Sequence, residues 1–476
     1  MNRKADLAAI ALIALSLVRI ASTWTLYSAT VDEPMHISAG LQLYSQHVYT
    51  LQPENPPLPR VVLALAPWLG GMRFDPQRET AEQLLRVFHS NNRYKTNLVL
   101  ARCGNLLFFI LASAAVWLWA RRELGSRGGL VATILFTLQP MVAGHAGVAT
   151  HDMAATASVT WALFAFSRWL DVSTLQRAAL FGLAFGLAIL CKFSCLGYVP
   201  AAALAMFVVR AIRERVAWRS IAPSFGVALV ATLITVWCGY LFHAGTFVAG
   251  IRGLRVIDQS ATHFSYLFGE VSANGWWWYF PAAVALKSTI ASLVLALFAR
   301  GRGVEPLAGA AAILLVSMTS HLDLGVRYVL PLYALVAVAG ASVIGARQWL
   351  VTALLAWHCI ASIVAIPDAF PYFNEAAGSR PWQSLLDSNI DWGQDVLRLR
   401  HVAREKKIER IGLAVFGWHD WDALGFPPHY DVQRGVPSQG WVAVSEQMFG
   451  VAQRTPWLEG RPYQRVGKSI RLYYVR

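Results

Sequence analysis

Long apolar segments recur through the first three quarters of the chain, and they constrain its fold more than any other feature. About 20 mostly apolar residues suffice to cross a bilayer as a helix, and helices satisfy their own backbone hydrogen bonds there. The sequence therefore predicts a polytopic α-helical membrane protein with about eleven transmembrane helices. The apolar runs begin near Leu7, Leu98, Leu130, Met153, Ala178, Leu196, Ile221, Trp277, Leu307, Tyr328 and Leu350.

The composition agrees with lipid as the main solvent. Of the 476 residues, 56% are hydrophobic and 14% are charged, whereas a soluble domain has about 25% charged residues. The net charge is +14, and nearly all of the excess lies before residue 368, among the hydrophobic runs. That distribution is typical of a membrane protein with basic cytoplasmic loops, and it excludes the solvated basic face of a nucleic-acid-binding protein.

The basic residues also predict an orientation. With a cytoplasmic N-terminus, every loop that falls on the inside carries Arg, as the positive-inside rule requires. Eleven crossings then place the C-terminal part on the outer face of the membrane. The basic residues of the predicted inside loops are Arg121, Arg122, Arg127, Arg168, Arg177, Arg210, Arg213, Arg215, Arg219, Arg300, Arg302 and Arg347.

Two outer segments are large enough to have structure of their own. The first outer loop, 25–97, follows the first span and contains a helical apolar pattern at 79–88. Residues 368–476 alternate short β-type runs with Gly, Pro and Asp turns, so we expect a small C-terminal α/β domain on the outer side. The sequence thus predicts a membrane domain at 1–367 and a second domain at 368–476.

Carboxylates and isolated cations gather at the ends of predicted spans. Asp32 and Glu33 follow the first span, and Asp152 begins the fourth. These acidic residues could simply cap helices. The topology places them on one outer face together with Lys192 and Arg327, and such a set suits a reaction on an anionic lipid headgroup.

Several motifs at these positions resemble those of the GT-C superfamily, the lipid-carrier-dependent glycosyltransferases that include protein O-mannosyltransferases and aminoarabinose transferases. The likeness covers essentially the whole membrane part and therefore implies a GT-C fold. The motifs that carry it are Asp32-Glu33-x-x-His36, Asn55-Pro56-Pro57-Leu58, His151-Asp152, Lys192-Phe193-Ser194 and Arg327-Tyr328-x-x-Pro331.

The C-terminal part is similar to a bacterial subset of that superfamily. The similarity implies a bacterial inner membrane, with the C-terminal domain in the periplasm or outside the cell. The same residues could instead form a tight Asx-turn before a helix at Asp395. The signature reads Tyr372-Phe373-Asn374-Glu375 and then Asp387-Ser388-Asn389-x-Asp391-Trp392-Gly393-Gln394-Asp395.

The resemblance implies a sugar donor carried on a polyprenyl phosphate and a lipid, glycan or protein acceptor. Asp32 is the expected base of a one-step inverting transfer of a hexosyl or pentosyl group, with Glu33 and Asp152 in positioning roles. Hard oxygen ligands would permit Mg²⁺ or Mn²⁺, although no motif requires a metal. The residues expected near the lipid phosphate or donor are Lys192, Arg327, Tyr328, His36 and Asn55.

Two other classes of protein remain open from the residues alone. A transporter would place ionisable residues at mid-membrane and would show paired halves, neither of which is visible in this sequence. A non-catalytic polyprenyl-lipid-binding protein would use the acidic residues only as helix caps. Donor turnover, donor binding without turnover, and solute flux distinguish the three.

Overall fold

The computed structural model describes residues 3–214, 219, 221–260, 263–345 and 347–476, and each predicted apolar run coincides with a helix. Helix α5 contains two of the runs and is kinked at Gly125, while α12 and α13 share one run and meet at a bend of 112°. The helices that carry the runs are α1 (Arg3–Ala21), α5 (Tyr94–Thr137), α7 (Asp152–Asp171), α8 (Leu175–Cys191), α9 (Cys195–Glu214), α10 (Ala222–Gly239), α12 (Tyr279–Lys287), α13 (Ile290–Leu297), α14 (Val304–Ser317), α15 (Leu332–Ala341) and α16 (Gln348–Val364).

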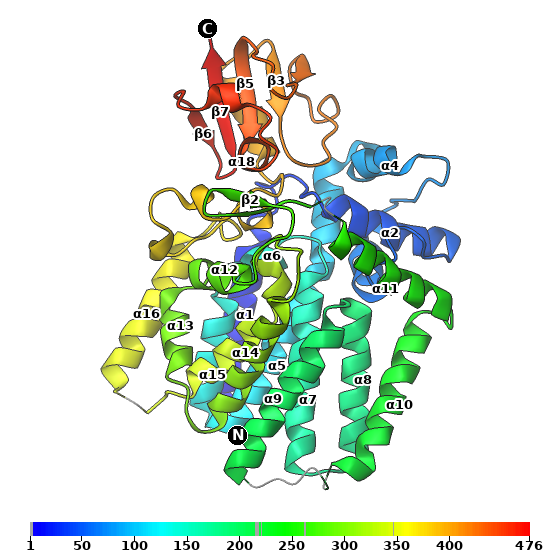
Figure 1. Cartoon of the computed structure of the whole chain (residues 1–476), viewed down its shortest axis with the longest axis vertical. Helices are drawn as coiled ribbons and strands as arrows, with labels where there is room; N and C mark the ends of the chain where they lie inside the picture. The colour runs from blue at the N-terminus through cyan, green and yellow to red at the C-terminus, as the bar shows by residue number, and fades with distance from the viewer. Residues whose placement is uncertain (1–2, 215–218, 220, 261–262, 346) are drawn as a thin grey trace.

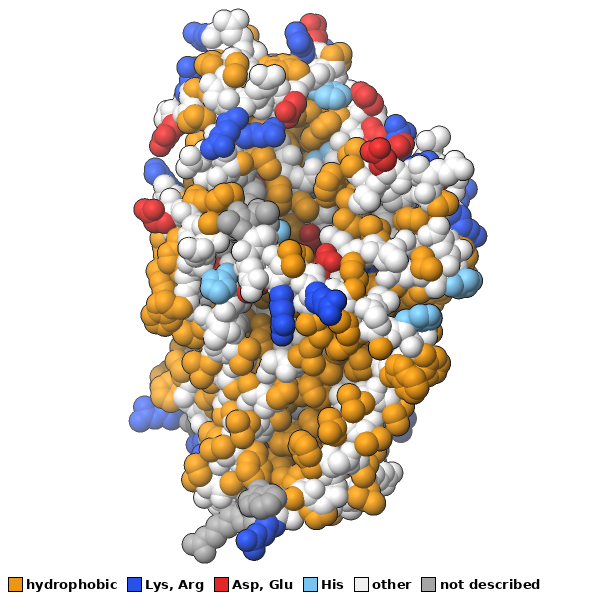
Figure 2. All heavy atoms as spheres, turned by 45° about the vertical axis from the view of Figure 1, so that its right-hand side comes forward, with side chains coloured by type: hydrophobic (Ala, Val, Ile, Leu, Met, Phe, Trp, Pro, Cys, Tyr) orange, Lys and Arg blue, Asp and Glu red, His pale blue; other side chains and the backbone are white. Residues whose placement is uncertain are grey.

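By length and apolarity, three helices in the described part can each cross a membrane: α5, α9 and α10. The bent pair of α12 and α13 adds a fourth if it acts as one span. Hydrophobic side chains cover the lower part of the face in Figure 2, and charged side chains lie mainly above them. The chain is thus a membrane protein built of helices, and the exact number of crossings stays a prediction.

The loops predicted to share the inner side meet at one end of the bundle. Arg210 pairs with Asp171 at 2.5 Å and with Glu305 at 2.6 Å, and Arg302 pairs with Glu214 at 2.9 Å. These side chains come from the ends of α7, α9 and α14 and from η3 (Gly301–Gly303), the turn before α14. The N-terminus lies at this end in Figure 1, and the strands of the C-terminal domain lie at the opposite end. Of the predicted basic loop residues, Arg215 lies outside the described residues.

Outer segments cover the other end of the bundle. The predicted helix at 79–88 is present, with Leu84 and Phe88 buried against protein. Residues 265–272 form a two-stranded hairpin, and Leu267 pairs with Leu385 of the C-terminal part. The elements of this layer are α2 (Glu33–Gln46), α3 (Pro57–Leu69), α4 (Thr80–Arg86), η1 (Val87–Asn92), α6 (Pro140–Ala146), α11 (Ala244–Gln259), β1 (Ser265–Leu267), β2 (Glu270–Ser272) and η4 (Val326–Val329).

The predicted small α/β domain is confirmed. Its five strands have the order β4-β3-β5-β7-β6, in which β3 runs parallel to β4 and β5, and β7 runs antiparallel to β5 and β6. Apolar residues of α17 pack on the sheet through Leu399 and Ala403. The elements are η7 (Asp387–Asn389), α17 (Val396–Glu405), β3 (Ile411–Ala414), β4 (His429–Asp431), β5 (Gly440–Ser445), α18 (Glu446–Gly450), β6 (Gln464–Val466) and β7 (Ile470–Val475).

Candidate functional site

Asp32 forms an ion pair with Arg327 where the first outer loop meets η4. The Arg327 Nη1 atom lies 2.6 Å from the Asp32 Oδ2 atom. The Asp32 carboxylate makes no capping hydrogen bond at the start of α2, so the capping alternative fails at this position. Its side chain is 29% exposed, whereas that of Arg327 is 7% exposed. Asp32 is therefore a reachable carboxylate held by a nearly buried cation.

Asp152 lies on the other side of the same arginine. Its carboxylate accepts a hydrogen bond from Lys192 Nζ at 2.6 Å and lies 3.9 Å from Arg327 Nη1. Lys192 stands in the break between α8 and α9, where the sequence predicted the interruption. Asp32, Arg327, Asp152 and Lys192 thus form one cluster of two carboxylates and two cations, called the charge cluster below.

Glu33 points away from the charge cluster and is fully buried. Arg102 of α5 holds its carboxylate through two hydrogen bonds of 2.8 Å. The backbone nitrogens of Thr30 and Ala149 each donate to it as well, at 2.8 Å. Both charged side chains have 0% exposure. Glu33 therefore fastens the first outer loop to α5 and to the segment before Asp152.

His36 and Asn55 support the loop around the cluster. The His36 ring accepts a hydrogen bond from Arg60 and lies 3.1 Å from His151, next to Asp152. Burial lowers the pKa of His36 well below its usual value, so its ring is neutral at physiological pH. The backbone carbonyl oxygen of Asn55 accepts a hydrogen bond from the Tyr49 hydroxyl at 2.6 Å, so Asn55 helps to hold this loop through its backbone.

Aromatic rings flank the cations of the charge cluster. The Tyr328 ring lies 4.4 Å from Lys192 Nζ and 5.1 Å from the Arg327 guanidinium carbon. The Trp392 ring of the C-terminal signature lies 4.5 Å from the same guanidinium. Such contacts stabilise a cation by about 0.5–2 kcal/mol, more when water is excluded. The C-terminal part therefore contributes a side chain to the cluster.

The rest of the signature binds the loop that carries Arg327. Ser388 donates to the carbonyl oxygen of Leu324, and Asn389 accepts a hydrogen bond from the Val326 backbone nitrogen at 3.1 Å. Gly325 between them adopts φ +134°, and an added Cβ there would meet the Ser388 hydroxyl at 2.1 Å. The close approach explains why glycine occupies this position.

Three other signature residues make hydrogen bonds that hold the backbone or a neighbouring helix. Asn374 donates to the carbonyl oxygens of Ala285 and Ser288 at the end of α12. Asp391 accepts from the backbone nitrogen of Gly393, two residues ahead, so the Asx-turn predicted as an alternative does form. Glu375 accepts a hydrogen bond from the Trp357 indole at the surface.

Asp387 is a signature carboxylate that interacts electrostatically with Arg327 and Asp32 of the charge cluster. It adopts φ +53°, an uncommon conformation for a residue other than glycine. Burial raises its pKa to about 6, against the opposing pull of the Arg327 guanidinium. A strained backbone and a shifted carboxyl pKa together are typical of functional sites.

The carboxylates present do not fit a metal centre. Within the described ranges, no three His, Cys, Asp or Glu side chains converge on a point that could hold an ion. Asp32 and Asp152 each face a cation instead, at 2.6 Å in both cases. These carboxylates are therefore arranged as partners of Arg327 and Lys192 and not as ligands of a divalent cation.

Sequence reasoning missed three buried cations that organise this region. Arg60 donates to His36, Tyr49 and the 51–52 backbone. Arg102 holds Glu33, and Lys287 donates to the carbonyl oxygen of Phe370 at 3.3 Å. A lone basic residue inside or beside an apolar run is costly unless paired, and that cost could have drawn attention to Arg102 and Lys287.

Comparisons with known proteins agree with the motifs. A family model described as dolichyl-phosphate-mannose-protein mannosyltransferase matches residues 94–240, less than a third of the chain. A search of curated protein sequences gave no match.

The structural comparisons cover nearly the whole chain. ArnT from Cupriavidus metallidurans bound to undecaprenyl phosphate aligns with a TM-score of 0.56 and 14% identity, over 97% of each chain. Its apo structure aligns over the same shares with 14% identity and a TM-score of 0.53. The Saccharomyces cerevisiae Pmt1-Pmt2 complex aligns over 53% of this chain and 34% of that one, with 18% identity and a TM-score of 0.41. The resemblance inferred from the motifs is confirmed at the level of architecture: the chain has the GT-C fold, which it shares with ArnT.

Proposed function

We propose that the chain is an inverting glycosyltransferase that moves a sugar from a polyprenyl-phosphate carrier to an acceptor hydroxyl. The observation that carries the proposal is the charge cluster, which lies at the predicted outer end of a GT-C bundle. Its two cations suit a lipid phosphate, and its exposed carboxylate suits an acceptor hydroxyl. ArnT, which has the same fold, was observed bound to undecaprenyl phosphate.

In this mechanism the donor phosphate binds between Lys192 and Arg327 and takes over part of the pairing that Asp32 provides. The anomeric carbon–oxygen bond breaks, and its electron pair leaves with the phosphate. The acceptor oxygen attacks from the opposite face and gives its proton to Asp32. The two cations stabilise the charge that develops on the phosphate. Displacement in one step inverts the anomeric centre.

The remaining residues position this machinery. Asp152 holds Lys192 at 2.6 Å, and Glu33 holds the first outer loop on Arg102. Tyr328 and Trp392 provide aromatic faces for the cations. The signature from Asp387 to Trp392 fixes the loop that carries Arg327, with Asp387 facing the same space. We propose a positioning role for this signature.

Incubation of the purified chain in nanodiscs with radiolabelled polyprenyl-phosphate sugars tests the proposal. We expect the label to leave the lipid, either to an added acceptor or slowly to water, with opposite anomeric configuration in the product. Saturable binding without turnover would instead assign a lipid-binding protein. Flux of solute into sealed vesicles without label transfer would assign a transporter.

A further inference from the structure

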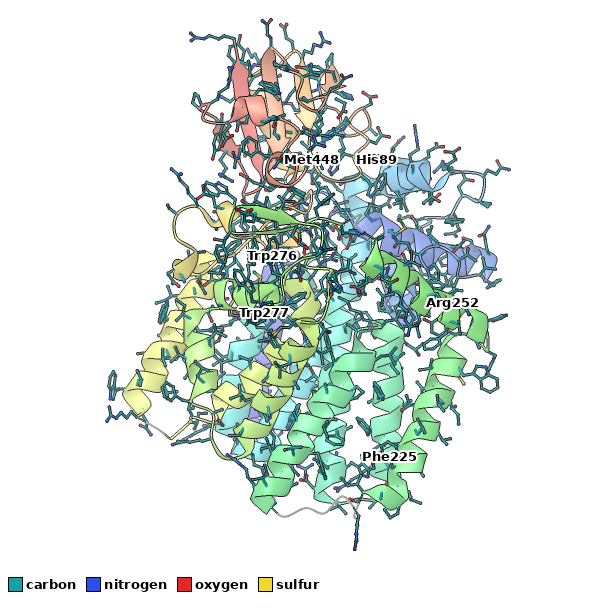
Figure 3. The ribbon with its side chains drawn as sticks, viewed as in Figure 1. His89, Phe225, Arg252, Trp276, Trp277 and Met448 are labelled. Atoms are coloured by element: carbon teal, nitrogen blue, oxygen red, sulfur yellow. The ribbon has the colours of Figure 1, made fainter. Side chains whose placement is uncertain are left out.

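A cavity of about 700 Å³ lies in the C-terminal domain, apart from the charge cluster. That volume is in the range of small-molecule sites. Met448, labelled in Figure 3, lies at the lower edge of the domain, on the side of the first outer loop, from which Leu85 joins the lining. The aromatic residues of the lining are Phe416, Trp418, Trp421 and Tyr430.

The cavity lies where the topology of the sheet favours a binding site. The parallel strands β3, β4 and β5 end at Ala414, Asp431 and Ser445. The cavity is lined by the segment that follows β3, by β4 itself and by Met448 of α18, which follows β5. In the order of strands, β4, which follows β3 in the chain, lies toward one edge of the sheet. The strands β6 and β7, which follow β5, lie toward the opposite edge. The carboxyl ends of such diverging strands form the crevice in which open α/β sheets bind ligands.

The lining favours a neutral ligand with apolar faces. Asp431 and Arg454 neutralise each other through an ion pair of 3.0 Å. Burial lowers the pKa of His419 to about 4, so this imidazole is uncharged at neutral pH. Trp418 is 39% exposed and therefore offers its indole to a ligand. Flat aromatic faces beside polar edges suit sugar rings, which have apolar C–H faces and hydroxyl rims.

A layer of packed side chains joins the wall of the cavity to the charge cluster. Val31, the residue before Asp32, lines the cavity, and its backbone nitrogen donates to the Trp392 carbonyl oxygen at 3.0 Å. Phe416 also lines the cavity and packs with Val31 against Trp392. The Trp392 ring in turn lies 4.5 Å from the Arg327 guanidinium. Val31 therefore lies between the cavity and Asp32, so a ligand seated in the cavity would lie beside the charge cluster.

We propose that this cavity binds the acceptor, and that the acceptor is a neutral carbohydrate chain held by aromatic contacts with Trp418 and its neighbours. That the bound carbohydrate is the acceptor rests on the proposed function. Carbohydrate binding in the cavity does not depend on the proposed function. It excludes an acceptor whose recognised part is a phosphate group or a peptide.

Binding to the full chain in nanodiscs tests the proposal, with saturation-transfer NMR as the readout. The probes are neutral trisaccharides of glucose, mannose, galactose and N-acetylglucosamine, a phosphorylated glucose trisaccharide, and a peptide rich in Ser and Thr. We expect at least one neutral trisaccharide to bind, and Trp418→Ala to weaken that binding about tenfold or more. The matched control is Tyr474→Ala, which removes a 61% exposed aromatic side chain of the same sheet.

The proposal is overturned if no neutral trisaccharide binds, if Trp418→Ala leaves binding unchanged, or if the peptide or the phosphorylated sugar is the ligand that Trp418→Ala weakens. Donor turnover to water, measured on the same preparations, separates this result from the proposed function. Turnover without sugar binding overturns only the acceptor site. Sugar binding without turnover supports the cavity and overturns the transferase.

Discussion

At the scale of single residues, two adjacent carboxylates have opposite surroundings. Asp32 is partly exposed and pairs with Arg327, whereas both oxygens of Glu33 are bound by Arg102 and by backbone donors. A fully paired, fully buried carboxylate cannot accept a proton from a substrate without breaking its own contacts. We therefore propose the proton transfer for Asp32 and a structural role for Glu33.

The Glu33–Arg102 pair gives a stability prediction. Removing one partner of a buried ion pair leaves an uncompensated charge, so we expect Glu33→Gln to lower the free energy of unfolding by about 3–5 kcal/mol. Thermal unfolding in detergent measures the loss. The double variant Glu33→Gln with Arg102→Met should recover part of it, because it buries no lone charge. A Glu33→Gln protein as stable as wild type would refute this role.

The sequence predicted the members of the charge cluster because each stood at the edge of an apolar run, where a charged residue is costly. Lys192 marked the break between two helices, and Arg327 began a span. The sequence did not predict that the Trp392 ring lies over the Arg327 guanidinium, because that contact joins residues far apart in the chain. It also grouped Glu33 with Asp32, since adjacency in the chain does not tell which side chain turns inward.

At the scale of elements, the signature between α16 and α17 bridges the two parts of the chain. It contacts η4 through Ser388 and Asn389 and the first outer loop through the Trp392 carbonyl oxygen. Residues typical of turns form such a bridge because each local bend exposes backbone groups that a second segment can bind. Through these contacts the C-terminal part holds the backbone next to Arg327 in place.

The bridge predicts a measurable effect on donor binding. Trp392→Phe keeps most of the packing but weakens the contact with the Arg327 guanidinium, so we expect undecaprenyl phosphate to bind about two- to fivefold more weakly. The same exchange at Trp382, whose ring lies 3.9 Å from the Arg465 guanidinium, is the control and should leave binding unchanged. Equal effects of the two exchanges, measured by titration in nanodiscs, would contradict the role of Trp392.

A buried imidazole next to β3 makes one contribution to the stability of the C-terminal domain that is lost in acid. The pKa of His419 is lowered to about 4, from about 6.5 in an unfolded chain. Between these two pKa values the unfolded state binds a proton that the folded state does not. The His419 contribution to the free energy of unfolding therefore decreases as the pH is lowered, by about 2 kcal/mol at pH 5 relative to neutral pH. Burial raises the pKa of Asp391 to about 7 and acts in the opposite direction.

The comparison of wild type with His419→Gln isolates the histidine. On going from pH 7.5 to pH 5.0, we expect amide-exchange protection in β3 and β5 of wild type to decrease relative to that of the variant. Asp391 contributes equally to both proteins and cancels. An identical change of protection in the two proteins would show that the pKa of His419 does not differ between the folded and the unfolded chain.

At the scale of the whole molecule, the apolar runs predicted the positions of the helices well because lipid leaves few alternatives. The ion pairs that join Arg210, Asp171 and Glu305 show that three loops predicted to share a side meet at one end. In the C-terminal domain the short β-type runs of the sequence correspond to β3, β5 and β7. The sequence did not predict β4 or β6, each of three residues, which are too short for a clear alternating pattern.

The central claim is that the charge cluster is a catalytic centre with Asp32 as its base, and Asp32→Asn tests it most directly. Single-turnover transfer from a radiolabelled polyprenyl-phosphate sugar is measured beside binding of undecaprenyl phosphate. The matched control is Asp258→Asn, at a surface carboxylate whose partner is His321. The account predicts that Asp32→Asn slows transfer by about 10²–10⁴-fold, with lipid binding and folding retained and the control fully active. Near-normal transfer by Asp32→Asn would contradict it.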